Sequence, residues 1–330
     1  MTGSSAANRS TNASEMSVTT LLMRPASIRG AVAVFSQGVG AGGGLAGVPR
    51  SPPMTSLADA HVLITGGSSG IGFATAQHAL RRGARVSLVA RDVDRLATAE
   101  DALESAIGDG TRVAAEPADV TDAESFESAL GLLVAQLGPV DVLVTSAGGA
   151  RPGHFEELPA SVFEEQMALN YFGTLNPVRA VVPSMIERRR GHVLMVSSGA
   201  GIVGVYGYSA YSPAKFAVRG LAETLRAELK PHAIVVACAY PPDTDTPGLA
   251  REGEMKPAAT ASISATIKVR SADAVGKRIV AGIERNRLVI TFDSSTAMLA
   301  KAGGLLGPVV RATMDRHVRR ADRKKSWDQE

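Results

Sequence analysis

Between residues 57 and 292, short apolar runs alternate with longer segments of helical periodicity. The runs are rich in Val, Ile and Leu and almost continuously apolar, as in strands covered by helices on both faces. We predict strands near 60–65, 85–90, 112–117, 140–145, 191–197, 233–239 and 287–292. We predict amphipathic helices near 71–82, 92–107, 122–137, 161–189, 209–230 and 271–285. Seven strands alternating with helices indicate an α/β fold with a doubly wound parallel sheet.

This pattern predicts a single domain, residues 57–292, with an extension at each end. Residues 1–56 are rich in Ser, Ala and Gly, so we expect them to be disordered; their Arg-containing, acid-poor character also resembles an organelle transit peptide. Residues 30–49 are uncharged but contain seven glycines, which argues against a signal peptide or a membrane-spanning helix. Residues 293–330 form a basic extension.

The net charge of +3 resides in the extensions, because the middle of the chain carries a net charge of −3. A nucleic-acid-binding domain would have a clustered cationic face, so we expect no nucleic-acid partner. The single cysteine, Cys238, is set in an apolar run and fits a reducing, cytoplasmic compartment. The six histidines are scattered, so we expect no metal site.

A glycine-rich turn follows the first predicted strand and leads into a helix. Such a turn lets backbone approach a pyrophosphate and places that anion at the helix N-terminus, as in the Rossmann fold. The alternative is a tight turn without a ligand. The candidate cofactor-binding residues of this turn are Gly66, Ser68, Ser69, Gly70, Ile71 and Gly72.

The end of the second predicted strand bears on the choice of cofactor. An NAD site would place an acidic residue there, but the chain has Arg91, with Arg95 one helical turn later. Guanidinium groups bind a 2′-phosphate well, which favours NADPH over NADH. The alternative is that Arg91 is a solvated residue at the start of a helix. Asp119, after the third strand, is a candidate adenine contact or a helix cap.

A further constellation lies downstream. Ser198 follows the fifth predicted strand, and Tyr211 and Lys215 are spaced i, i+4 on one helix face. An ammonium beside a phenol favours the phenolate, so we expect Lys215 to lower the pKa of Tyr211 into a useful range for acid–base catalysis. A serine hydroxyl nearby could orient the substrate oxygen. The alternative for the Tyr–Lys pair is an ordinary surface pair.

Taken together, these motifs resemble the short-chain dehydrogenase/reductase family over about residues 58–292. The family's cofactor turn matches Thr65–Gly72, and its catalytic residues match Asn170, Ser198, Tyr211 and Lys215. The resemblance implies that Tyr211 supplies a proton, Ser198 positions the oxygen, Lys215 binds the nicotinamide ribose, and Asn170 holds a water. It also implies cofactor contacts from Ala147, Gly148, Tyr211, Lys215, Pro241 and Thr244. Ser146 stands where the family usually has Asn, a mainly structural residue, so the local support of this loop is in doubt.

Other segments resemble the sphingoid-base ketoreductases of that family, above all the Pro/Asp/Thr stretch at 240–248. This resemblance implies a long-chain 3-keto lipid substrate, with reduction of 3-ketosphinganine to sphinganine the leading reaction. Another β-ketoacyl or long-chain ketone substrate is the alternative. A non-catalytic cofactor-binding or lipid-surface protein is the alternative of a different class. We expect the stretch to continue to about 256–257 as a substrate lid, the alternative being a plain connector.

Two expectations concern partners. The family resemblance implies a homo-oligomer, a dimer or tetramer formed through the long helices near 161–189 and 209–230. The basic C-terminal segment could lie against anionic lipid headgroups as a peripheral contact, or could be a solvated helix. Residues 296–310 are only weakly apolar and are interrupted by Lys301 and several glycines, so they cannot span a membrane.

Overall fold

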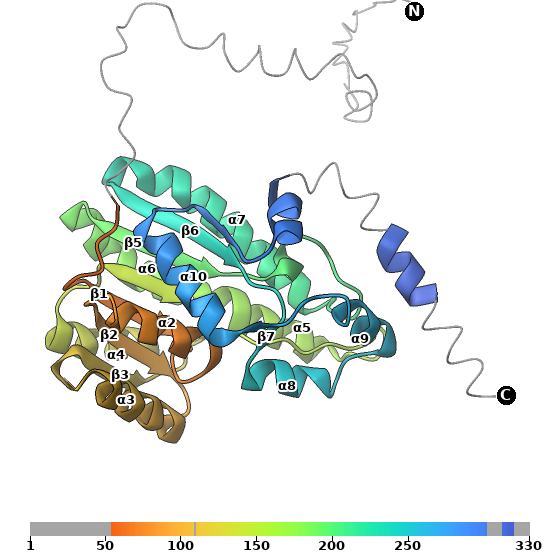
Figure 1. The fold of residues 1–330 in the computed structure, drawn as a ribbon, viewed down its shortest axis with the longest axis horizontal. Coiled ribbons are helices and arrows are strands. Elements are labelled where there is room, and N and C mark those ends of the chain that lie inside the picture. The colour runs from red at the N-terminus through yellow and green to blue at the C-terminus, as the bar shows by residue number, and fades with distance from the viewer. Residues whose placement is uncertain (1–53, 109, 302–311, 320–330) are drawn as a thin grey trace, which may run out of the picture. The chain divides into compact units, whose positions relative to one another are not determined.

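The computed structural model describes residues 54–108, 110–301 and 312–319 (Figure 1). Within them, a seven-stranded parallel sheet has the order β3-β2-β1-β4-β5-β6-β9. Its strands are β1 (His61–Thr65), β2 (Arg85–Ala90), β3 (Val113–Pro117), β4 (Val142–Thr145), β5 (Gly191–Val196), β6 (Ile234–Tyr240) and β9 (Val289–Thr291). The predicted fold class and all seven predicted strands are confirmed.

Helices cover both faces of this sheet (Figure 1). One face carries α2 (Gly70–Leu80), α3 (Val93–Ile107) and α10 (Ala272–Glu284). The other carries α4 (Ala123–Leu137), α6 (Gly173–Arg188) and α7 (Tyr211–Leu229). The chain winds outward in both directions from the neighbouring strands β1 and β4. Ligands of such folds bind where the strand order reverses, at the carboxyl ends of the strands.

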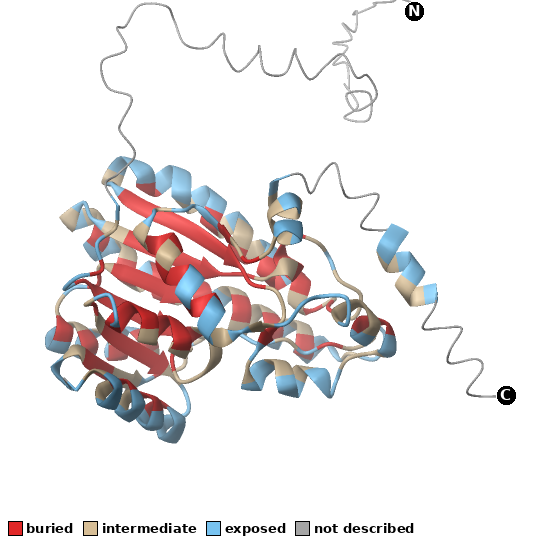
Figure 2. Cartoon of the chain, viewed as in Figure 1, coloured by how far each residue is buried: buried red, intermediate tan, exposed pale blue. Residues whose placement is uncertain are grey.

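The strands supply two apolar cores, one on each side of the sheet. Because side chains alternate along a strand, Val62 and Ile64 join the core under α2 and α10, whereas Leu63 joins the core under α4 and α6. The central strands are buried along their whole length (Figure 2). Cys238 lies in the second core, and burial raises the pKa of its thiol to about 11, which keeps it protonated.

The predicted helix near 161–189 is wrong as a single element. It is divided into α5 (Ala160–Met167), a π-helical turn (Ala168–Phe172) and α6. π-helical turns are frequent at functional sites, because the extra residue redirects a side chain. Here the turn contains Asn170, which is fully buried.

The segment after β6 is more ordered than the loop that the sequence predicts. It contains β7 (Thr244–Asp245), α8 (Pro247–Gly253), α9 (Ala258–Ser264) and β8 (Arg270–Ser271), and β7 pairs with β8. Thr246 caps α8, since its side-chain oxygen accepts a hydrogen bond from Leu249 N at 3.2 Å. We call residues 241–271 the lid segment.

The extensions are described only in part. The expectation of disorder for 1–56 falls almost entirely outside the described residues. Towards the C-terminus, residues 294–301 and 312–319 are helical, and the rest of that basic segment lies outside the described residues. No helix in the described ranges has the length and apolar character needed to cross a membrane.

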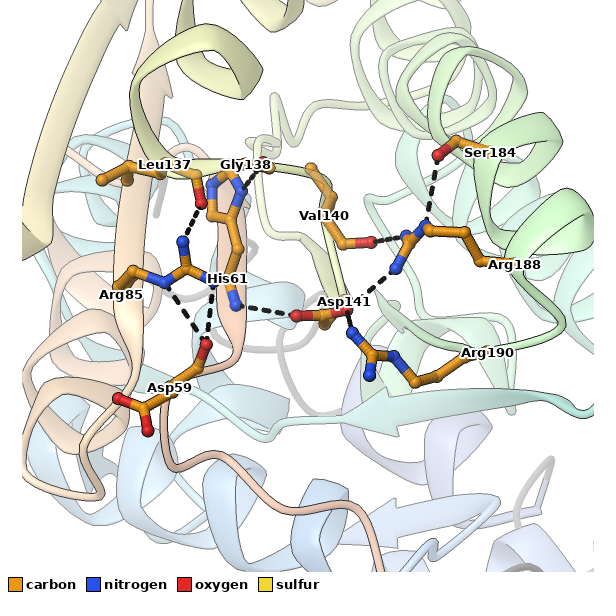
Figure 3. A network of polar contacts seen from close by, with 10 residues as sticks. All are labelled: Asp59, His61, Arg85, Leu137, Gly138, Val140, Asp141, Ser184, Arg188 and Arg190. Atoms are coloured by element: carbon orange, nitrogen blue, oxygen red, sulfur yellow. Dashed lines mark hydrogen bonds and ion pairs between the residues drawn. The ribbon is translucent and has the colours of Figure 1, made fainter.

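At the opposite edge of the sheet from the strands' carboxyl ends, a polar network joins β1, β4 and α6 (Figure 3). Asp141 accepts hydrogen bonds from His61 N at 3.1 Å, Arg188 Nη1 at 2.9 Å and Arg190 Nη2 at 2.7 Å. Burial acts to raise the pKa of Asp141, but these donors outweigh it and lower the pKa below its ordinary value. The network fastens the sheet edge and stands apart from the candidate active site.

Candidate active site

The glycine turn between β1 and α2 is shaped to receive an anion. Gly66 and Gly70 have φ values of +67° and +56°, which disfavour any residue with a side chain. A Cβ on Gly66 would lie 2.8 Å from Ala147 Cα, and one on Gly72 would lie 2.3 Å from Gly66 O. Ser69, which precedes α2, makes no side-chain cap to its first turn. The turn therefore presents backbone amides at a helix N-terminus, as a pyrophosphate requires.

The other predicted residues of this turn have different surroundings. Ser68 and Ser69 are partly exposed at the rim, while Ile71 packs against the core below. Thr246, at the start of α8, approaches the turn so closely that a Cβ on Gly70 would lie 2.9 Å from its methyl carbon. The lid segment therefore touches the turn directly.

The carboxyl ends of β2 and β3 bring Arg91 and Asp119 together. Arg91 Nη1 lies 3.5 Å from Asp119 Oδ2, and the Arg91 side chain is 64% exposed. Burial acts to raise the pKa of Asp119, but hydrogen bonds from Thr121 and the charge of Arg91 outweigh it and lower the pKa. Arg95 lies farther back on α3, with Nη1 4.0 Å from Asp92 Oδ2. Asp92 is the residue that caps α3, since its side chain accepts from Arg95 N.

The loop after β4 passes between Asn170 and Lys215. A Cβ on Gly148 would lie 2.8 Å from Asn170 Oδ1 and 3.2 Å from Lys215 Nζ, so only glycine leaves these two groups their space. Asn170 Nδ2 donates to Gly149 O at 3.0 Å, and its Oδ1 accepts from Gly149 N at 3.2 Å. The side chain is thus held against the loop, and it comes from the π-helical turn.

Ser146 stands where the family usually has Asn. The loop after β4 is held instead by hydrogen bonds from its backbone amides to Thr65. Ser146 N and Ala147 N both donate to Thr65 Oγ1, at 3.2 and 3.3 Å. Ser146 N also bonds Thr65 O at 3.2 Å. The last residue of β1 therefore fixes the position of Ala147 against the glycine turn.

The three residues of the predicted catalytic constellation meet at the start of α7. Tyr211 is the first residue of the helix, and Lys215, one turn later, has its Nζ 5.7 Å from the centroid of the Tyr211 ring. Lys215 Nζ donates to Val196 O at 3.1 Å, at the end of β5. Ser198 approaches Tyr211 from the residues that follow β5, and its Oγ accepts from Ala200 N at 3.1 Å.

The pKa of Tyr211 moves opposite to the sequence-based expectation. Burial raises it above the ordinary value, the carboxylates of Glu252 and Asp243 raise it further, and the Ser198 hydroxyl opposes both. Burial also lowers the pKa of Lys215 to about 8. The expected lowering by Lys215 is wrong for the chain alone, because desolvation penalises the charged form of both groups.

Pro241 and Thr244 lie where the lid segment leaves β6. Gly199 N donates to Pro241 O at 3.1 Å, which ties the lid segment to the loop that carries Ser198. Thr244 is buried, and its hydroxyl donates to Pro242 O at 2.8 Å. Both predicted residues therefore stand at the base of the lid segment, and Pro241 is tied to the loop that carries Ser198.

A polar cluster beside Tyr211 escapes the sequence analysis. Tyr208 packs its ring against that of Tyr211, with centroids 5.6 Å apart, and its hydroxyl donates to Glu252 on α8. Lys256 Nζ lies 2.9 Å from Glu252 Oε1 and 3.5 Å from Asp243 Oδ2. No periodicity links these positions, which meet only because the lid segment folds back over α7.

A hollow of about 270 Å³ lies beside the residues that precede α7. Its lining includes His154, Phe155, Tyr206 and Ser209. Tyr206 and His154 contact edge to face and share a hydrogen bond of 3.2 Å. Phe155 is 70% exposed at the mouth and meets only the edge of Phe163 among aromatic rings in the described residues. The hollow is large enough for part of a small organic substrate.

A family model for short chain dehydrogenases matches residues 60–257, which contain every element of this site. The chain belongs to this family. Short-chain dehydrogenases are oxidoreductases that use a nicotinamide dinucleotide, and the glycine turn fits that cofactor.

Relatives of this short-chain dehydrogenase carry names that specify a reaction. This chain is 43% identical over 265 residues to a 3-dehydrosphinganine reductase of Danio rerio, and the match covers 80% of each chain. It is 44% identical over 261 residues to a 3-ketodihydrosphingosine reductase of Bos taurus, covering 78% of this chain and 79% of that one. A solved short-chain dehydrogenase from Sphingobium yanoikuyae, in complex with NADPH, is similar with a TM-score of 0.64 and 28% identity, covering 76% and 95%.

Proposed function

We propose that the chain is an NADPH-dependent reductase of a long-chain 3-keto lipid, with 3-ketosphinganine to sphinganine the leading reaction. The observation that carries the proposal is the meeting of Ser198, Tyr211 and Lys215 beside the glycine turn. The chain that holds them is 43–44% identical to proteins named for this reduction.

The proposed cofactor residues divide along the carboxyl edge of the sheet. The amides of the turn Gly66–Gly72 would hold the pyrophosphate, and Arg91, with Arg95 behind it, the 2′-phosphate. Asp119 would contact the adenine. Ala147, Gly148, Pro241 and Thr244 would line the nicotinamide half. When bound, NADPH supplies the hydride that reduces the ketone carbon.

Tyr211 supplies the proton in this proposal. Its raised pKa keeps the hydroxyl protonated through neutral pH, so it is ready to donate to the substrate oxygen as that oxygen gains negative charge. Ser198 holds the same oxygen by a hydrogen bond. The tyrosinate that remains is stabilised by Lys215, whose pKa of about 8 leaves it largely protonated at neutral pH.

Asn170 is proposed to serve the return of the proton to Tyr211. Its amide is held rigidly by Gly149, and Gly148 lies so close to both Asn170 and Lys215 that a side chain there would crowd them. A water held by Asn170 would pass a proton towards Lys215. Asn170 is thus a positioning residue for the relay.

The hollow beside Tyr206 and Phe155 would take the start of the alkyl chain. Its exposed phenyl ring at the mouth suits a substrate whose tail extends towards a lipid surface. A peripheral contact of the basic C-terminal segment with anionic lipid fits the same proposal, and flotation with anionic liposomes tests it; no co-flotation would reject it.

We also propose a homo-oligomer, a dimer or tetramer, formed through α6 and α7. Phe172 and Phe216, on or beside these helices, are 46% and 40% exposed, which supports an apolar contact there. Light scattering on the purified chain tests this, and a monomer at micromolar concentration would refute it.

The experiment that tests the function compares substrates in one assay. NADPH oxidation is measured with 3-ketosphinganine, with β-ketoacyl thioesters of matched length, and with a simple long-chain ketone. We expect the highest kcat/KM with 3-ketosphinganine. In Tyr211→Phe, turnover should fall about 10²–10⁴-fold while NADPH still binds. A preference for thioesters would favour the alternative substrate class, and no oxidation of NADPH with any ketone would favour a non-catalytic protein.

A further inference from the structure

Four polar side chains linked to Tyr211 through Tyr208 have no direct contact with substrate or cofactor in the mechanism proposed above. They are Tyr208, Asp243, Glu252 and Lys256, which we call the Glu252 cluster. Glu252 Oε1 accepts from the Tyr208 hydroxyl and from Lys256 Nζ, and Lys256 Nζ also pairs with Asp243 at 3.5 Å. The cluster joins α8 to the residues just before α7.

The charges of the Glu252 cluster do not balance. Two carboxylates face one ammonium, and Tyr208 is neutral because burial and Glu252 raise its pKa. The side chains of Lys256, Glu252 and Asp243 are only 7%, 15% and 21% exposed. No second cation pairs with either carboxylate in the described ranges. One negative charge is therefore left over in a largely buried place, which costs free energy unless a cation arrives.

The excess charge lies within electrostatic reach of the Tyr211 hydroxyl. The rings of Tyr208 and Tyr211 are in contact, and both Glu252 and Asp243 raise the pKa of Tyr211. A negative charge there opposes the tyrosinate that forms when Tyr211 gives up its proton. In the chain alone, the cluster therefore works against the proposed proton transfer.

Ser209 is a second place with an unsatisfied polar group in the residues that lead into α7. Ser209, the next residue after Tyr208, has a buried hydroxyl oxygen without a hydrogen-bond partner among the described residues. Ser209 also lines the hollow that contains Tyr206 and Phe155. A cation carried by a substrate beside its ketone would supply the charge that the Glu252 cluster lacks.

We propose that Glu252, supported by Asp243, is the counter-ion of an ammonium group carried by the substrate on the carbon next to its ketone. Glu252 is then a specificity-determining residue that selects 2-amino ketones. The inference rests on the proposed function, because 3-ketosphinganine has a primary amine at that carbon, whereas β-ketoacyl thioesters have none. With the ketone oxygen at Tyr211, an amine on the neighbouring carbon would be close to Tyr208, whose ring contacts that of Tyr211 and whose hydroxyl donates to Glu252.

The ammonium has two effects in this account. It neutralises the leftover charge of the cluster, which contributes to substrate binding. It also removes the opposition to tyrosinate, so Tyr211 gives up its proton more readily when the amine is in place. A ketone of the same length without the amine gains neither effect.

The test uses the full chain, with NADPH, on 3-ketosphinganine and on its analogue that lacks the amine. For the wild type, we expect kcat/KM to be about tenfold or more higher with the amine. In Glu252→Gln, which keeps the size and loses the charge, this ratio should fall towards one. Glu254→Gln makes the same change two residues away, on an exposed side chain, and should leave the ratio as in the wild type.

Further measurements separate specificity from damage to the fold. With the analogue, Glu252→Gln should be as active as the wild type or faster, since the charge that opposes tyrosinate is gone. Its basic limb in the pH–rate profile with the analogue should move to lower pH. If Glu252→Gln does not fold, Asp243→Asn provides the same readouts.

The outcomes distinguish this inference from the proposed function. If the wild type reduces 3-ketosphinganine but the amine-to-analogue ratio is the same in Glu252→Gln, the inference is overturned and the function stands. If the wild type does not discriminate between the two ketones, the inference is likewise overturned. If the wild type reduces neither ketone, the proposed function fails and the inference fails with it.

Discussion

Arg91 and Asp119 form an ion pair across the ends of β2 and β3, with Arg91 Nη1 3.5 Å from Asp119 Oδ2. The two residues predicted to bind different parts of one nucleotide are thus neighbours. Asp119 is itself held by Thr121, whose amide and hydroxyl donate to its Oδ1 at 2.9 and 2.8 Å. A fixed carboxylate therefore orients a guanidinium that is otherwise exposed. Such orientation favours binding of a phosphate group by the guanidinium.

The pair leads to a prediction on cofactor choice. Arg91→Glu places a carboxylate beside Asp119, where it repels a 2′-phosphate and can accept a hydrogen bond from a ribose hydroxyl. We expect the ratio of kcat/KM for NADPH over NADH to fall about tenfold or more. Steady-state kinetics with each cofactor measure this ratio. Lys277→Glu, an equal charge change on the exposed face of α10, is the control. An unchanged ratio in Arg91→Glu would mean that Arg91 does not bind the 2′-phosphate.

The sheet and its helices could be predicted because their apolar periodicity is local. The division of the predicted helix 161–189 could not, because it coincides with a non-local contact, the hydrogen bonds of Asn170 to Gly149, 21 positions earlier. The same holds for Tyr208 and Glu252, which are 44 positions apart and meet through the fold of the lid segment. The start of α8 could have been predicted from the sequence, because Thr246 followed by Pro247 is typical of an N-cap and a first helical residue.

The expected direction of the Tyr211 pKa shows a different limit. A lysine four residues away predicts a lower pKa, but the outcome is set by how far both groups are desolvated and by the charges that the fold adds. Glu252 and Asp243 are two such charges, and neither lies near Tyr211 in the sequence. Motif spacing can therefore identify the group that acts, while its pKa needs the folded chain.

A second prediction concerns the close approach of Asn170 and Lys215 to Gly148. Gly148→Ala adds a methyl group 2.8 Å from Asn170 Oδ1 and 3.2 Å from Lys215 Nζ, which must push these groups apart or displace a relay water. We expect kcat to fall about 10²-fold, the effect of misplacing groups by about 1 Å. Gly149→Ala is the matched control, since its Cβ would meet only Leu169 at 3.9 Å. Equal kcat values for the two variants would contradict the assigned role of Asn170 and Lys215 in the relay.

A third prediction concerns the alkyl chain. Phe155 is 70% exposed at the mouth of the hollow, and a long acyl chain would cover it. Phe155→Ser should raise KM about tenfold for a long-chain ketone, as expected for the loss of one large apolar contact, with no change for a short-chain ketone. Leu132→Ser, on α4 and 54% exposed, serves as the control. If the KM for the long-chain ketone is the same in Phe155→Ser as in Leu132→Ser, the alkyl tail does not contact Phe155.

The last prediction concerns acid stability, which depends on two buried histidines far from the lid segment. Burial lowers the pKa of His61 and of His192 from 6.5 to about 4. The unfolded chain therefore takes up protons that the folded chain refuses, so the stability present above pH 6.5 is progressively lost as pH falls towards 4. Each histidine contributes on the order of 3 kcal/mol to that loss. Asp141, with its lowered pKa, contributes only at still lower pH.

Urea unfolding between pH 7 and 4.5 measures this dependence without involving Asp141. His192→Leu cannot titrate, so its free energy of unfolding should vary less steeply with pH than that of the wild type, whatever its stability at pH 7. His232→Leu removes a partly exposed histidine and should keep the wild-type slope. A slope in His192→Leu as steep as in the wild type would mean that His192 gains a proton without unfolding, and that its buried Nε2, which has no hydrogen-bond partner in the described residues, finds one at low pH.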